Sequence, residues 1–212
     1  MDRAPELDSR LIDEVRRLMD PLVLASASPN RLETLRQCGI SVRACPQDTC
    51  EDYGPLSDPG QIVRHISKMK MDSYLSNIAH DEDTLAIALD TMVSFDGRML
   101  GKPGSRQEAK EMLTSFSGRV QDVVTGYVLY VPLLGTFCSS DLSRVRFRRL
   151  GEDDVERYLD GGEWQGAAGG YRIQRNGWRL VESIEGSWSN VIGIPLESIV
   201  AALSDLGWRA GH

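Results

Sequence analysis

The chain has 212 residues, 41% of them hydrophobic, and its 24 basic and 31 acidic residues give a net charge of -7. This length favours one well-filled core, and the acidic balance disfavours general binding to nucleic acid or to an anionic membrane surface. We expect a cytoplasmic protein with reduced thiols, because no apolar run reaches the length of a membrane span, residues 1–20 do not resemble a secretion signal, and no Cys-x-x-Cys pair occurs.

Hydrophobic spacing predicts alternating helices and strands along the chain. An amphipathic helix over residues 6–19 is expected to form an N-terminal extension (residues 1–20) of a single domain over residues 21–212. The further elements expected are a strand over 22–25, a helix over 29–38, a strand over 40–44, a helix over 61–78, a strand over 84–95 with a return over 98–100, a helix over 105–116, strands over 120–133 and 137–147, a helix over 153–159, a hairpin of 171–174 with 178–184, and a last helix from Pro195. This alternation predicts a mixed α/β domain.

The turn between the first strand and the second helix carries a candidate phosphate site. Ser28 suits the N-cap and Pro29 the first helical position, so Arg31 falls in the first turn, where a cation opposes the helix dipole at a cost of about 0.3–1 kcal/mol. A bound anion would explain that cost, because free backbone amides, the hydroxyls of Ser26 and Ser28 and the guanidinium could form a phosphate cradle. A solvated arginine beside an ordinary cap explains the same spacing.

Asp90 interrupts an otherwise apolar strand. Ala86 and Ala88 share its face, so small side chains flank a carboxylate that is costly to bury. The pattern indicates a ligand or metal position, although a carboxylate paired with a basic neighbour would have the same pattern. A phosphatase of the haloacid dehalogenase type needs a second aspartate two residues later, where this sequence has Met92.

Three lysines and one acidic loop are further candidates. Lys102 follows the return strand and can come back near Asp90 to contact phosphate oxygens, although a lysine in a turn is more often solvated. Lys68 and Lys70 lie two apart on a predicted helix, so at most one of them faces a given site. Glu51 and Asp52 lie in a polar loop, where acidic residues are usually only solvated. If that loop closes over the site, one of the two could help Asp90 to hold a divalent cation, with Mg2+ the natural choice beside phosphates.

These pieces follow one another in an order that resembles one known family. A Ser-x-Ser-Pro-x-Arg motif occupies residues 26–31, an Asp-Thr pair residues 90–91, and a Gly-Lys-Pro element residues 101–103. The later matching segments are Ser117-Gly118-Arg119, Val124-Thr125-Gly126, residues 168–174 and residues 190–196. In this order, over residues 22–203, the motifs resemble the Maf family of nucleotide pyrophosphatases.

The resemblance implies an elongated mixed sheet of the ITPase-like kind, with helices on its faces and a cleft between two lobes. It also implies release of pyrophosphate from a nucleoside triphosphate with Mg2+ or Mn2+, an association with septum formation, and a possible homodimer. Asp90 and Glu51 would serve the metal or the attacking water, Lys102 the phosphates during catalysis, and Gln174 the base. The other residues that the resemblance assigns to the substrate are Ser26, Ser28, Arg31, Thr91 and either Lys68 or Lys70.

Three interpretations of the function are compatible with the sequence. The first is a pyrophosphatase that cuts between the α and β phosphates. The Ile-Gln pair that ends the tyrosine motif, before Arg175, resembles the family branch that acts on dTTP and UTP rather than the branch that acts on 7-methyl-GTP. However, Asn30 stands where that branch usually has an arginine, and Arg172 and Arg175 replace glycines. A catalytically weakened, nucleotide-binding regulatory protein linked to cell division is therefore the alternative, and a structural partner in division, with no occupied cleft, is a third reading.

Overall fold

The computed structural model describes residues 6–49, 54–77 and 83–210. Its elements, in chain order, are α1 (Ser9–Met19), β1 (Leu22–Leu24), α2 (Pro29–Gln37), β2 (Val42–Ala44), α3 (Pro59–Asn77), β3 (Ala86–Phe95), β4 (Arg98–Leu100), α4 (Arg106–Phe116), β5 (Val120–Val131), β6 (Gly135–Phe147), α5 (Glu152–Asp160), the short 3-10 helices η1 (Ala168–Gly170) and η2 (Asn176–Leu180), β7 (Val181–Glu185), α6 (Trp188–Ile192) and α7 (Leu196–Asp205). Among the described helices, none combines the length and apolarity needed to cross a bilayer.

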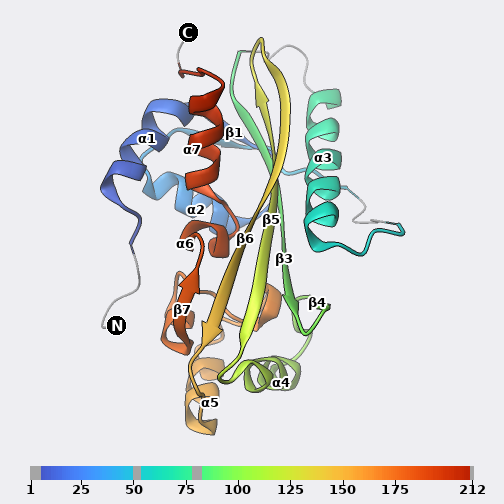
Figure 1. Cartoon of the computed structure of the whole chain (residues 1–212), viewed down its shortest axis with the longest axis vertical. Coiled ribbons are helices and arrows are strands. Elements are labelled where there is room, and N and C mark those ends of the chain that lie inside the picture. Colours follow the sequence, from blue (N-terminus) through green and yellow to red (C-terminus); the bar gives the residue numbers. More distant parts are fainter. Residues whose placement is uncertain (1–5, 50–53, 78–82, 211–212) are drawn as a thin grey trace.

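The strands form one seven-stranded mixed sheet. Its order is β2-β1-β3-β5-β6-β7, with β4 added to the edge of β3. β1 is parallel to β2 and β3, whereas the remaining pairs are antiparallel. β3, β5 and β6 run along the long axis, so the molecule is elongated, as Figure 1 shows. The predicted mixed α/β fold with an elongated sheet is confirmed.

Side-chain alternation along β3 explains how the helices are placed. Leu85, Ile87 and Leu89 join the core under α1, α2 and α7, and farther along the same face Val93 and Phe95 join a second core under α4 and α5. These two cores make two lobes that share the long strands: an upper lobe with α1, α2 and α7, and a lower lobe with α4 and α5 (Figure 1).

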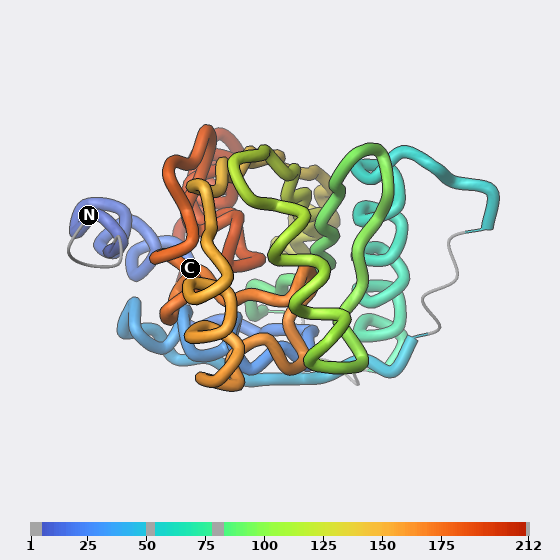
Figure 2. Tube along the Cα trace, turned by 90° about the horizontal axis from the view of Figure 1, so that it is seen from below, coloured from blue at the N-terminus to red at the C-terminus, as the bar shows by residue number. Residues whose placement is uncertain are grey.

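α3 covers the opposite face of the sheet, as the view from below shows (Figure 2). Ala86 and Ala88 pack there against Met71 of α3. α3 can approach the sheet closely because Gly126 of β5 has no side chain. A Cβ at this position would lie 2.4 Å from the carbonyl group of Val63 in α3. The small residues around Asp90 therefore make room for a helix.

A notch interrupts one edge of β3. β1 pairs with β3 at residues 86–87, and β4 pairs with it at residues 93–95. Between these contacts, no strand of the described chain lies along residues 88–92 on that edge. Asp90 and Thr91, whose side chains leave opposite faces of β3, both line the cavity at this notch.

Two turn predictions had opposite outcomes. The Asp96-Gly97 hairpin is confirmed, with positive φ angles of 53° and 72° at the two residues. The hairpin predicted around Asn176-Gly177 is wrong, because residues 171–174 form no strand, η2 begins at Asn176, and β7 pairs with β6 instead. The Gly177 and Arg175 amides turn back onto the carbonyl oxygen of Arg172, which closes a local turn in place of a strand pair.

Candidate active site

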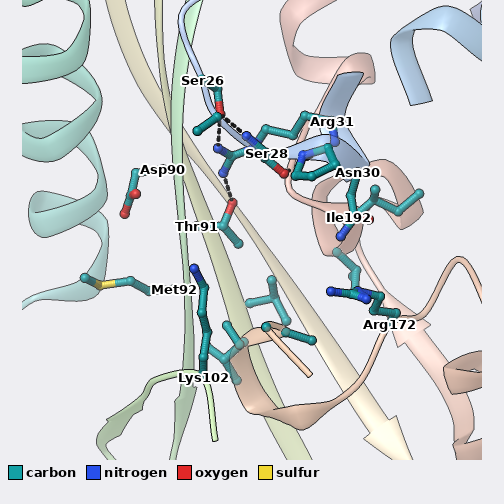
Figure 3. Close-up of a pocket in the computed structure, with 18 of the residues that line it drawn as sticks. Ser26, Ser28, Asn30, Arg31, Asp90, Thr91, Met92, Lys102, Arg172 and Ile192 are labelled. Carbon is teal, nitrogen blue, oxygen red and sulfur yellow. Dashed lines mark hydrogen bonds between the residues drawn. The ribbon is translucent and has the colours of Figure 1, made fainter. Parts of the chain in front are cut away.

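The main pocket lies at the β3 notch and is lined by both lobes. Its volume is about 810 Å³, within the range typical of small-molecule sites. The upper lobe contributes residues 26–31 at the start of α2, and the lower lobe contributes Lys102 and residues 171–175. Figure 3 shows several of these side chains around the opening. The expected cleft between two lobes is therefore present.

The pocket is more basic than the chain as a whole. Among the described residues that line it, five are basic and three are acidic: Arg31, Lys70, Lys102, Arg172 and Arg175 against Glu33, Asp48 and Asp90. The whole chain carries a net charge of -7. This local excess of positive charge is suited to an anionic ligand.

Asp90 lies on the α3 face of the notch and forms an ion pair with that helix. The Lys70 Nζ is 2.8 Å from the Asp90 Oδ1, and the two side chains are each 12% exposed. The paired carboxylate considered from the sequence is therefore present, and the same carboxylate lines the pocket. The pair offsets part of the cost of removing both charges from water.

The other helix lysine lies elsewhere. Lys68 forms an exposed ion pair with Asp72 one turn along α3, at 2.8 Å, and is not among the residues that line the pocket. Lys70 is thus the one of the two that the helix directs to the notch, as their spacing of two residues requires.

Arg31 holds the notch together through its guanidinium group. Nη1 donates to the Ser26 hydroxyl and to the Leu89 carbonyl oxygen, both at 2.9 Å, and so occupies an acceptor that a neighbouring strand would otherwise use. Nη2 donates to the Thr91 hydroxyl at 2.8 Å (Figure 3), and Nε donates to the Gly193 carbonyl oxygen at 2.7 Å. Because the residue is only 7% exposed and most of its N–H groups bond protein acceptors, Arg31 offers the pocket chiefly its charge.

The hydroxyl of Thr91 belongs to a directed hydrogen-bond chain. Thr125 Oγ1 donates to the Asn190 carbonyl oxygen at 3.3 Å, and the two threonine oxygens are 2.9 Å apart. Since each hydroxyl has one proton, Thr91 must donate to Thr125 while it accepts from Arg31. The Thr91 proton therefore points away from the pocket, which leaves its oxygen as an acceptor only.

The start of α2 is organised as its sequence predicts. Ser28 is the N-cap and accepts from the Arg31 amide at 3.4 Å, and Pro29 occupies the first helical position. The Ser28 amide donates to the Ser26 hydroxyl at 3.3 Å. Because this end of the helix lines the pocket, the positive end of its dipole adds to the basic character of the site.

Comparison with known proteins assigns the family. The family model described as Maf-like protein matches residues 21–206. The chain belongs to this family. It is 36% identical to the dTTP/UTP pyrophosphatase of Halalkalibacterium halodurans, over 90% of this chain and 98% of that one. It is also 36% identical to the dTTP/UTP pyrophosphatase of Pyrococcus furiosus, over 90% and 97% of the two chains.

A solved structure, that of a HAM1 protein from Coxiella burnetii, is 14% identical and covers 88% of this chain and 100% of that one, with a TM-score of 0.45.

The remaining candidates of this Maf-like protein lie as follows. Lys102 is exposed and extends from the lower lobe toward Thr91 (Figure 3), and Gln174 is half-buried in the pocket wall. Glu51 lies outside the described residues. The sequence indicated Arg172 only as a departure from the family pattern. It did not predict the hydrogen bond from Thr125 to the Asn190 carbonyl oxygen, although Thr125 and Asn190 both belong to the matching segments.

Proposed function

We propose that this Maf-like protein is a nucleoside triphosphate pyrophosphatase. It cleaves the bond between the α and β phosphates of dTTP and UTP, or of modified forms of them, to yield a monophosphate and pyrophosphate. One observation carries the proposal, namely that Asp90, Lys70, Arg31 and Lys102, from four distant segments, line a single pocket. The names of the two relatives, each aligned over 90% of this chain, support the same reaction.

The charge of the pocket matches a triphosphate. A point charge on a flexible stem, as in Lys102, suits phosphate oxygens, and the start of α2 adds backbone dipoles of the same sign. These groups offset the negative charge that develops on the leaving pyrophosphate. The upper lobe and the lower lobe thus bind the same anion from two sides.

Asp90 acts on the attacking water in this proposal. The water oxygen bonds to the α phosphorus, the bond from that phosphorus to the bridging oxygen breaks, and the pyrophosphate leaves while Asp90 accepts the proton of the water. Lys70 holds the Asp90 carboxylate in place through the 2.8 Å contact at Oδ1. Arg31 acts through Thr91 and Ser26 by fixing the walls of the notch.

Mg2+ or Mn2+ is the cofactor that we propose. Within the described ranges, no group of three or more His, Cys, Asp or Glu side chains could enclose a metal ion. A magnesium ion usually takes only one or two carboxylates and completes its shell with substrate phosphates and water, so the Asp90 carboxylate fits this mode. Glu51 would be the second carboxylate. When bound, the ion would polarise the phosphoryl oxygens and offset their charge.

A substrate panel tests the proposal. Purified protein is incubated with each common ribo- and deoxyribonucleoside triphosphate, with Mg2+, with Mn2+ and with a chelator, and monophosphate and pyrophosphate are quantified. We expect equal amounts of both products, strongest with dTTP and UTP and lost with the chelator. Release of single phosphates would contradict the position of cleavage, and tight nucleotide binding without turnover would favour the regulatory alternative.

A further inference from the structure

Arg172 enters the pocket from the side opposite Asp90 (Figure 3), and hydrogen bonds hold its backbone in place. Its amide donates to the Tyr158 hydroxyl oxygen at 2.9 Å, and its carbonyl oxygen accepts from the amides of Arg175 at 3.2 Å and Gly177 at 3.0 Å. A Cβ at Gly177 would lie 2.4 Å from that carbonyl oxygen, so the turn requires glycine. Residue 172 therefore has a defined position in the lower lobe.

Burial alternates along this segment. Tyr171 and Ile173 are 7% and 1% exposed and pack into the core of the lower lobe. Arg172 and Gln174 are half-buried and line the pocket. The two polar side chains therefore belong to one stretch of the pocket wall.

The Arg172 guanidinium is anchored at one nitrogen and has unused donors at the others. Nη2 donates to the Gln165 carbonyl oxygen at 2.7 Å. Nε is buried without a hydrogen-bond partner, and Nη1 makes no hydrogen bond within the described part of the chain. Arg31 is the opposite case, because its guanidinium donates four hydrogen bonds to protein acceptors. Because Nε is buried and Nη2 is bonded to the protein, Nη1 is the donor that remains for an acceptor on a ligand.

We infer that Arg172 is a specificity-determining residue that, beside Gln174, donates to the O4 keto oxygen of a uracil or thymine base. This inference rests on the proposed function. A guanidinium only donates, whereas the Gln174 amide both donates and accepts. Uracil and thymine present two keto oxygens and an N3–H donor, which complements this pair. Cytosine has an amino donor in place of the O4 oxygen and no proton on N3, so donors would face donors.

The test compares UTP with CTP, which share the ribose and the triphosphate and differ only in the base. We expect Arg172→Leu to lower kcat/KM for UTP by about 10- to 100-fold, the worth of one hydrogen bond to a charged group, and to change the CTP value little. Arg179→Leu is the matched control, because Arg179 stacks on Trp178 and does not line the pocket. It should keep the wild-type ratio of the two values.

An equal fall for UTP and CTP would show that the guanidinium acts on the part the nucleotides share, and it would overturn the inference, as would an unchanged UTP value. If Arg172→Leu does not fold, Arg172→Lys provides the second test. A lysine carries its donors on a single nitrogen and lacks the planar fork that spans the Gln165 carbonyl oxygen and the base, so the UTP to CTP ratio should fall. An unchanged ratio would refute the role of Arg172.

Failure of the proposed function gives a different result, namely a wild-type protein without turnover of any nucleotide. The base reading is then tested by calorimetric binding of UMP and CMP to wild-type protein and to the Arg172→Leu variant. Preference for UMP that disappears in the variant supports the inference, and equal binding of both nucleotides to wild-type protein contradicts it.

Discussion

The pair of Asp90 and Lys70 allows a structural role to be separated from a catalytic one. We expect Asp90→Asn to reduce turnover far more than it reduces stability, because the variant keeps the size of the side chain and removes its charge and its capacity as a base. Loss of a general base costs about 10²- to 10⁴-fold in rate. The counterpart Lys70→Met leaves the Asp90 carboxylate without its 2.8 Å partner.

The stability cost follows from the burial of the pair. Removing one partner of a fully buried ion pair costs about 3–5 kcal/mol. The two side chains are each 12% exposed and border a pocket, so we expect about 2 kcal/mol for either single variant. For a chain of this size, that corresponds to a fall of about 4–8 °C in Tm. The double variant should regain about half of the lost stability, because no unpaired charge remains.

The assay combines urea unfolding with pyrophosphate release for wild-type protein, both single variants and the double variant. Stability should recover in the double variant while turnover stays as low as in Asp90→Asn. Asp72→Asn is the control, since it breaks the exposed pair with Lys68 on the same helix and should cost under about 0.5 kcal/mol with wild-type turnover. If Asp90→Asn releases pyrophosphate at the wild-type rate, or if the double variant recovers both its turnover and its stability, the ion pair stabilises the fold and has no catalytic role.

Three further predictions concern the framework of the site. Thr125→Val should destabilise the protein by about 1–3 kcal/mol in urea unfolding, because it breaks the buried hydrogen-bond chain, whereas Thr125→Ser should stay near wild type; equal effects of the two variants would argue against the chain. Gly126→Ala should lower the free energy of unfolding by about 3 kcal/mol, as measured by thermal unfolding, because its Cβ would lie 2.4 Å from the Val63 carbonyl group and push α3 away from the sheet. The same displacement should also reduce turnover. The backbone amide of Gly151 and, to a smaller extent, the Arg148 guanidinium lower the pKa of the Asp154 carboxyl below its ordinary value, so the stabilisation is present above that ordinary value and is lost as the pH falls through the lowered one. The difference in urea midpoint between wild type and Asp154→Asn should therefore shrink in acid, and a constant difference would contradict the linkage.

Features with local causes could be predicted from the sequence. The Ser28 cap, the Asp96-Gly97 hairpin and the alternation around Asp90 each depend on residues within a few positions of one another. The family could also be predicted, because ordered motifs over residues 22–203 restrict the choice more than any single motif does. The hairpin predicted at Asn176-Gly177 failed because the same dipeptide also closes a local turn, and the pairing of β7 with β6 is a long-range contact.

By itself, the sequence determined the mixed α/β class, the family and the kinds of side chain available for an anionic ligand, since periodicity, caps and motifs are properties of neighbouring residues. Only the tertiary structure decided that Lys70 rather than Lys68 meets Asp90, and that Arg31 bonds the carbonyl oxygen of Gly193, 162 residues away. The physical reason is that a buried donor must bond an acceptor that packing brings within reach. Packing brings together segments that are far apart in the sequence, so the local sequence around a residue does not indicate its partner.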